Sequence, residues 1–289
     1  MKSTKFKARS ALKSFAIYFA AIVVFLWTVL PLAWMFISSI TPSVDLLVTK
    51  GKWISSHLTF SRYASIFSSA DASSAGAVFF HSIKNSIFVS VLTMLFAILL
   101  GGIAAYAFAR LNFKFKNVLL MSTMFFQLLP SITLVIPLYI IARNLSLIDK
   151  LPTLIILYMS FVLPYAIWVM NGYYRTIPPD LESAARIDGC TWFSAYWHIV
   201  LPLALPGLIA VGALSFLMCW DEFLFALVFT TSLGSKTMPV AISEFSTRFG
   251  MDYGMVSTAG CIATIFPLLL AVIFQKYIVS GLTAGGVKE

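Results

Sequence analysis

Five long stretches of the sequence contain no charged side chain, and this feature restricts the possible folds more than any other. They cover residues 14–44, 85–109, 118–142, 151–174 and 253–275. A sixth apolar stretch, residues 199–230, is interrupted only by Asp221 and Glu222. Because a helix that crosses a bilayer needs about 20 mostly apolar residues, each stretch is long enough to be one membrane span. The sequence therefore predicts an all-α integral membrane protein with six transmembrane helices.

The composition supports this fold class and excludes several others. Hydrophobic residues make up 60% of the 289-residue chain and charged residues 11%, whereas a soluble domain carries about 25% charged residues. The formal net charge is +9, but the basic residues form small clusters at the ends of apolar stretches, so no nucleic-acid partner is expected. The cysteines and histidines lack the spacing of a metal or disulfide motif, and no metal site is expected.

The distribution of positive charge predicts how the chain is oriented in the membrane. Basic residues crowd the segment before the first span, at Lys2, Lys5, Lys7, Arg9 and Lys13. The apolar run that follows is too long for the core of a signal peptide and indicates an uncleaved signal anchor. Under the positive-inside rule the N-terminus is then cytoplasmic, and an even number of spans places the C-terminus on the same side. Lys84, beside the second span, is an exception to the rule.

This topology divides the chain into two parts. Residues 1–80 are expected to form the cytoplasmic N-terminus, the first transmembrane helix and an extracytoplasmic loop. Residues 81–289 are expected to form a core of five transmembrane helices with a cytoplasmic tail. The longest cytoplasmic loop, residues 175–198, lies between the fourth and fifth spans and is the most informative part of the sequence.

The loop of residues 175–198 is predicted to fold as a short helix–turn–helix. Pro178 and Pro179 stop the fourth span, and Asp180 can then cap a new helix. Gly189 ends that helix, as a glycine in the left-handed conformation does. Thr191 can cap a second helix, whose large aromatic residues are expected to form a belt at the membrane surface: Trp192, Phe193, Tyr196 and Trp197.

The first helix of this loop has a face of small residues. Leu181, Ala184 and Ala185 are spaced so that they lie on one side of a helix. An exposed helix with such a face suits docking into a groove on a soluble partner. The alternative, from the residues alone, is an ordinary helix that lies in the membrane interface.

The same loop resembles a known motif. The run Glu-Ser-Ala-Ala-Arg-Ile-Asp-Gly at residues 182–189, followed by Ile199, Leu201 and Pro202, is similar to the EAA loop of binding-protein-dependent ABC-transporter permeases. Counting back from Gly189, the glutamate that names the motif falls on Ser183, and the acid of this chain lies one position earlier, at Glu182. Both residues are therefore candidates for the contact with a partner.

Other short segments resemble carbohydrate-uptake permeases of the maltose-transporter type. They are Asn85-Ser86 with residues 104–110, Pro130 with residues 136–139, Trp220-Asp221-Glu222-Phe223, and the tail at residues 281–288. The family usually has Asn at the position of Asp221. These segments extend over nearly the whole chain in the family's order, so together they are a stronger signal than any one of them.

The resemblance implies the permease subunit of an ATP-binding-cassette importer for a carbohydrate, with an oligosaccharide as the expected substrate, in the cytoplasmic membrane of a bacterium or archaeon. The implied partners are a second, homologous permease, two cytoplasmic ATPase subunits, an extracytoplasmic sugar-binding protein and membrane lipid. The ATPases would hold ATP and Mg, so this chain itself would need no cofactor. The implied coupling residues are Leu181, Glu182, Ser183, Ala184, Ala185, Asp188, Gly189, Ile199, Leu201 and Pro202.

Polar residues inside the apolar stretches are candidates for a substrate pathway. An ionisable side chain deep in a bilayer costs on the order of 3 kcal/mol, so Asp221 and Glu222 should face a cavity or a partner. Either acid could accept hydrogen bonds from sugar hydroxyls; the favoured alternative is that it caps a helix break or pairs with the neighbouring permease. Gln127, in a span that Pro130 and Pro137 would kink, could line the pathway or make an interhelical hydrogen bond. The pathway candidates are Gln127, Trp220, Asp221, Glu222 and Phe223.

The sequence carries no catalytic motif. It lacks the Gly-x-x-x-x-Gly-Lys-Ser/Thr phosphate loop, and residues 234–237 have only part of that pattern, so the chain is not expected to be an enzyme. Two alternatives to a carbohydrate importer remain. One is an ABC permease for polyamines or phosphorylated polyols, although the carbohydrate-type tail argues against polyamines. The other is an ion-coupled secondary transporter, which would require internal inverted repeats that the sequence does not show.

Overall fold

The computed structural model describes residues 2–47, 54–55, 57–67, 75–248 and 252–284, and within these ranges all regular structure is helical. In these described ranges, five helical segments are long and apolar enough to cross a membrane: Lys13–Ile40, Gly76–Arg110, Leu151–Thr176, Trp192–Trp220 and Tyr253–Tyr277. The predicted all-α fold is confirmed. Part of the predicted extracytoplasmic loop and tail residues 285–288 lie outside the described residues.

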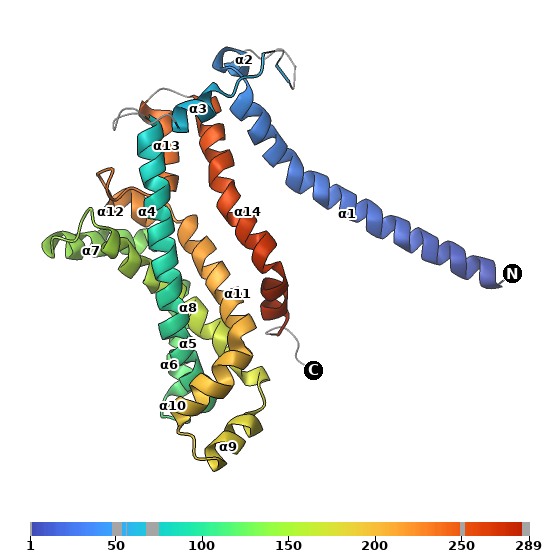
Figure 1. The fold of residues 1–289 in the computed structure, drawn as a ribbon, viewed down its shortest axis with the longest axis vertical. Helices are drawn as coiled ribbons and strands as arrows, with labels where there is room; N and C mark the ends of the chain where they lie inside the picture. The colour runs from blue at the N-terminus through green and yellow to red at the C-terminus, as the bar shows by residue number, and fades with distance from the viewer. Residues whose placement is uncertain (1, 48–53, 56, 68–74, 249–251, 285–289) are drawn as a thin grey trace.

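The first helix, α1 (Lys2–Ile40), packs with its C-terminal part against α14 (Tyr253–Ala284), and its N-terminal part is directed away from the other helices (Figure 1). Its large apolar side chains from Phe15 to Leu32 are exposed, whereas Ser38 and Ser39 near its end are buried. There, Arg62 on α3 (Ser61–Phe67) donates hydrogen bonds to the carbonyl oxygens of Ser39 and Thr41, at 3.1 and 2.7 Å. The bulk of α1 therefore has an apolar surface that requires lipid or another protein around it. The short helix α2 (Ser43–Leu47) follows.

The second span is one long helix that begins earlier than residue 85. It consists of α4 (Ala75–Phe96), a short π-helical segment (Ala97–Gly101) and α5 (Gly102–Arg110). A Cβ atom at Gly101 would lie 3.0 Å from the Cβ atom of Ala166 on α8 (Leu151–Thr176). Ala105, one turn further along, is fully buried. The small residues of this segment therefore allow two helix backbones to approach closely.

The third apolar stretch is bent, as its prolines predict, and whether it forms one of the six predicted spans stays open. It forms α6 (Lys116–Gln127) and α7 (Ser131–Asn144), which meet at an angle of 95°. The break falls at Pro130, which lacks a backbone N–H and favours an extended conformation in the residue before it. Each piece is shorter than the roughly 20 residues that cross a bilayer. The structure has six spans only if this bent pair counts as one.

The chain continues from α8 through two short helices, α9 (Pro179–Ile187) and α10 (Trp192–Ala195), and a π-helical segment (Tyr196–Val200) into α11 (Leu201–Trp220). It ends with α12 (Leu224–Phe229), α13 (Met238–Arg248) and α14 (Tyr253–Ala284). The fifth span therefore stops at Trp220, and its predicted extension to residue 230 is wrong, because Asp221 and Glu222 separate α11 from α12.

The core lies between α4, α5, α8 and α11. Its fully buried members include Val89, Tyr158, Val162, Met170 and Val211. A second cluster joins α4, α11, α13 and α14 at the opposite end of the bundle from α9; it includes Phe79, Phe216, Trp220 and Phe245. The two clusters share α4 and α11, so their helices form one continuous bundle. The short helix α9 projects beyond one end of this bundle (Figure 1).

Candidate functional site

The predicted helix–turn–helix is present, and prolines start it. Pro178 precedes the first helical residue and Pro179 occupies it, where the missing N–H of proline is not needed. Asp180 lies in the first turn, so the prediction that it caps α9 is wrong by two residues. Its carboxylate there still interacts favourably with the positive end of the helix dipole.

The turn between the two helices has the predicted chemistry. Gly189 has φ of +94°, which is the left-handed conformation that glycine adopts without strain. Its N–H donates to the carbonyl of Arg186 at 3.1 Å, and the N–H of Cys190 donates to the carbonyl of Ala185 at 3.0 Å. This pair of bonds is the Schellman motif. Thr191 Oγ1 then accepts from the N–H of Ser194 at 3.2 Å, so the predicted cap of the second helix is confirmed.

Glu182 points into the bundle and not toward solvent. Only 2% of its surface is exposed. Its Oε1 atom lies 2.5 Å from Nε of Arg110 at the end of α5, and its Oε2 atom accepts a hydrogen bond from the hydroxyl of Tyr106 at 2.9 Å. The guanidinium of Arg110 also donates from Nη2 to the carbonyl of Ile177, at 2.6 Å. The carboxylate of Glu182 therefore lies against α5 and not on the exposed surface of α9.

These bonds connect α5 to the end of α8 and to α9, whose bonded residues lie 67 and 72 positions further along the chain. The side chains of Arg110 and Glu182 are only 10% and 3% exposed, so water does not screen the pair. Breaking such a buried pair by removing one partner costs about 3–5 kcal/mol, because the other charge stays buried without compensation. We call the group Tyr106, Arg110, Ile177 and Glu182 the α5–α9 bridge.

A cluster of tyrosines lies beside this bridge. The ring centroid of Tyr196 is 4.8 Å from that of Tyr106, and its hydroxyl is 3.3 Å from the hydroxyl of Tyr174. Tyr196 is 4% exposed, so its predicted place in the interfacial belt is wrong. The remaining belt residues, Trp192, Phe193 and Trp197, are exposed as predicted.

The exposed face of α9 differs from the predicted one by one residue. Leu181 and Ala184 are exposed, but Ala185 is 8% exposed and lies on the same inward side as Glu182. Ile187 takes its place with 85% of its surface exposed. It follows Ala184 at i+3, so Leu181, Ala184 and Ile187 lie along an exposed arc of about 120°. We call Leu181, Ala184 and Ile187 the outer face. The spacing of Ile187 was a signal for it that the prediction missed.

The other predicted loop residues surround this face. Ser183 and Asp188 are exposed, and the hydroxyl of Ser183 donates to the carbonyl of Pro179 within its own helix, at 3.2 Å. Ile199 and Leu201 are half-buried, and Pro202 is exposed at the start of α11. They therefore support the helix that follows the turn and do not extend the outer face.

Glu222 caps a helix, as the favoured alternative for the two acids predicts. Its Oε1 and Oε2 atoms accept hydrogen bonds from the N–H groups of Phe225 and Ala226, at 2.8 and 3.1 Å. Both bonds lie at the start of α12, where helical N–H groups lack partners. Asp221 is exposed at the end of α11.

The remaining pathway candidates differ in burial and in their partners. Trp220 is 1% exposed and stacks on Phe216 inside the second cluster. Phe223 is 39% exposed. Gln127 Nε2 donates to the carbonyl of Phe161 on α8 at 2.8 Å, which is its interhelical alternative. Asp221 and Phe223 are thus the two candidates with exposed side chains near each other in the sequence.

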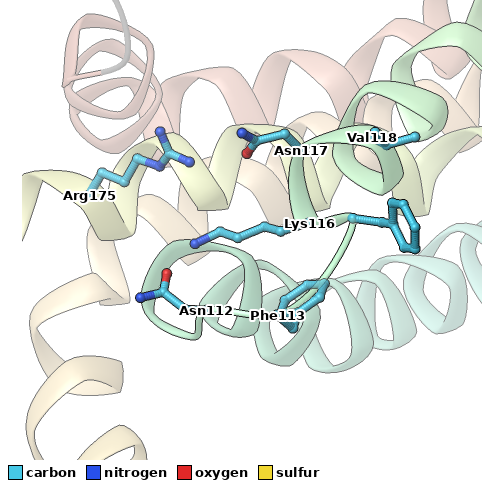
Figure 2. Close-up of a pocket in the computed structure, with 7 residues that line it drawn as sticks. Asn112, Phe113, Lys116, Asn117, Val118 and Arg175 are labelled. Carbon is cyan, nitrogen blue, oxygen red and sulfur yellow. The ribbon is translucent and has the colours of Figure 1, made fainter.

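A pocket of about 430 Å³ lies close to the α5–α9 bridge, between the α5–α6 loop and the last turn of α8. Figure 2 shows the side chains that line it. They are Asn112, Phe113, Phe115, Lys116, Asn117, Val118 and Arg175. Among the described residues, no three His, Cys, Asp or Glu side chains gather as metal ligands would.

Comparison with known proteins gives a consistent result. Residues 97–284 match the family described as "Binding-protein-dependent transport system inner membrane component". The chain is 39% identical over 264 residues to the trehalose transport system permease protein SugB of Mycobacterium tuberculosis, covering 91% of this chain and 93% of that protein. It is 32% identical over 268 residues to the diacetylchitobiose uptake system permease protein DasC of Streptomyces coelicolor, covering 93% and 95%. Its fold resembles a chain of a bacterial ABC transporter involved in the import of the polysaccharide alginate, with a TM-score of 0.74, 21% identity and coverage of 92% and 96%.

Proposed function

Because the chain belongs to the family of inner-membrane components of binding-protein-dependent transport systems, we propose that α9 is the element through which a partner ATPase moves the transmembrane helices. The chain is a permease subunit of an ATP-binding-cassette importer that takes up a carbohydrate. Membership of this family argues against the ion-coupled secondary transporter.

The substrate that we propose is an oligosaccharide, with a disaccharide as the simplest case. Trehalose and diacetylchitobiose, which name the two permeases described above, each consist of two sugar units. Both resemblances extend over more than nine-tenths of this chain, so they include the spans that would surround a substrate. Polyamines and phosphorylated polyols have less support, because neither is named for these relatives.

The proposed coupling mechanism uses the two sides of α9 differently. The outer face, with Leu181, Ala184 and Ile187, offers exposed apolar surface to a groove on the ATPase. The inner side carries Glu182, which is bonded to Arg110 on α5. A movement of the ATPase that displaces α9 would therefore displace α5 as well, and with it the closely packed α8. The observation that carries this proposal is the buried contact between Glu182 and Arg110.

The assembly that we propose follows from these surfaces. Two ATPase subunits, which hold ATP and Mg, would dock at the α9 end of this permease and of a second, homologous one. That end is then cytoplasmic together with both termini, and the opposite end would receive the extracytoplasmic sugar-binding protein. The exposed apolar length of α1 suits contact with lipid or with the second permease.

Placing a charge on the outer face tests the docking step. Ala184→Arg should prevent capture of the partner ATPase and abolish sugar uptake, because a guanidinium would have to enter an apolar contact. Asn144→Arg, at an exposed position at the end of α7, is the matched control and should leave both intact. Normal capture and uptake by Ala184→Arg would contradict the proposal.

A further inference from the structure

The pocket between α5, α6 and α8 carries polar groups that the coupling mechanism does not use. Figure 2 shows the polar ends of Asn112, Lys116 and Arg175 around one space, with the amide of Asn117 at its edge. Two cations and two amides can together donate several hydrogen bonds to one anion. None of the residues that line the pocket is acidic.

The two cations are not neutralised within the described part of the chain. The three ion pairs found there involve other cations: Arg62, Arg110 and Lys236. Lys116 Nζ donates to the carbonyl of Leu111 at 2.9 Å, and this bond leaves its charge without a counter-ion. Two neighbouring positive charges with no acid beside them repel each other and attract an anion.

The position of the pocket indicates where that anion comes from. Arg110 ends one apolar helix and Arg175 lies in the last turn of another, so the pocket lies where both spans leave the membrane. Its other side is apolar and exposed: Phe115 is 64% exposed and Val118 is 60% exposed. Phe115 has φ of +66°, a strained conformation for a bulky residue, in which its ring remains exposed. A positively charged pocket beside exposed apolar side chains, at the level where the helices leave the membrane, fits a phospholipid. The cations would face its headgroup phosphate and the apolar side chains its acyl chains.

We propose that this pocket binds the headgroup phosphate of an anionic phospholipid from the leaflet on the α9 side. The phosphate would accept hydrogen bonds from Arg175, Lys116 and the two asparagine amides, and Phe115 and Val118 would contact the acyl chains. Binding would hold the start of α6 against the end of α8. Arg175 lies two residues before Ile177, whose carbonyl bonds to Arg110, so the lipid would also stiffen the α5–α9 bridge. This last consequence rests on the proposed function, whereas the binding itself does not.

Lipid retention tests the binding directly. The complex, purified after mixing with phosphatidylcholine and phosphatidylglycerol, is analysed by native mass spectrometry for bound phosphatidylglycerol. The double variant Lys116→Gln/Arg175→Gln should weaken retention about 25-fold, since each cation near an anionic membrane contributes about fivefold. Lys116→Gln alone should weaken retention about fivefold. Its matched control is Lys114→Gln, which removes one positive charge from the same loop at a residue that does not line the pocket. It should retain the lipid nearly as well as the wild type.

Three results would overturn the proposal. One is equal retention by the double variant and the wild type. Another is an equal loss in Lys114→Gln, which would show a general effect of surface charge. The third is displacement of the lipid by inorganic phosphate, which would assign the pocket to a soluble anion. All variants should keep the wild-type melting temperature because these side chains are exposed or half-buried. If the variants lose the lipid as expected but hydrolyse ATP like the wild type, the pocket binds lipid but the lipid does not affect coupling.

Discussion

The Nε atom of Arg110 lies 2.5 Å from Oε1 of Glu182, although 72 residues separate the two in the sequence. Arg110 ends a long transmembrane helix, and Glu182 lies on the short helix α9 that projects from the bundle. The hydroxyl of Tyr106 holds the second carboxylate oxygen. This arrangement fixes the inner side of α9 to the membrane helices and leaves its outer face free for a partner.

Substitution can distinguish the two residues considered for the coupling contact, Glu182 and Ser183. Glu182→Gln should reduce sugar uptake at equal expression, because the charge-assisted bond to Arg110 is lost and a cation stays buried. Ser183→Ala should be nearly silent, since the hydroxyl of Ser183 bonds to its own helix. The comparison is made by uptake of labelled sugar into proteoliposomes. The reverse order of effects would mean that Ser183 makes the contact that matters.

Gly189 provides a test of the turn geometry. Gly189→Val should cost about 1–2 kcal/mol through backbone strain and change the direction of α10, which lowers substrate-stimulated ATP hydrolysis. A Cβ atom there would meet nothing within 4 Å, so the cost comes from the conformation and not from a clash. Gly172→Ala is the control, because Gly172 lies inside α8 with equally open surroundings. It should be neutral or stabilising, and stimulation unchanged in Gly189→Val would contradict this account of the turn.

The turn was predictable because its determinants are local. A glycine after a short helical pattern and a threonine two residues later specify a Schellman motif and a cap without help from the rest of the chain. The inward orientation of Glu182 and the burial of Tyr196 were not predictable in this way. Both depend on Tyr106 and Arg110, which a different span brings to the same place. Pro130 indicated a bend, but the angle of 95° depends on how α7 packs against α12 and on the bond from Gln127 to α8.

Glu222 should act as a helix cap and not as a sugar ligand. Glu222→Gln weakens two hydrogen bonds to backbone N–H groups and should lower the stability of the complex by about 1 kcal/mol. Uptake per folded complex should change little. The measurement pairs the melting temperature with uptake. A collapse of uptake with an unchanged melting temperature would instead assign Glu222 to the pathway.

Asp149 should make the loop between α12 and α13 sensitive to acid. Burial raises the pKa of Asp149, but hydrogen bonds from the N–H groups of Ser232 and Thr231 and from the hydroxyl of Ser235 outweigh it and bring the pKa well below its usual range. A folded-state pKa below the unfolded value adds stability that is present above about pH 4 and is lost as the pH falls further. Asp149→Asn should therefore lower the melting temperature at neutral pH and reduce its decline on acidification. An unchanged decline would show that other carboxylates cause it.

A substitution on the outer face of α9 should affect ATPase binding without affecting the stability of the permease. Ile187→Asp should weaken ATPase capture without lowering the melting temperature of the permease, because Ile187 makes little contact within the chain. Leu145→Asp, at a similarly exposed leucine after α7, is the matched control and should leave capture unchanged. Equal capture by Ile187→Asp and the wild type would remove Ile187 from the outer face.

The most direct test of the central claim is substrate-stimulated ATP hydrolysis by the assembled importer for Arg110→Gln, Glu182→Gln and the double variant. The ATPase should bind all three, because the outer face is intact. Each single variant should lower stimulation about tenfold. The double variant should lose no more stimulation than the more impaired of the two single variants, because both changes remove the same contact. Full stimulation in either single variant, or losses that multiply in the double variant, would show that Arg110 and Glu182 do not transmit the movement of α9.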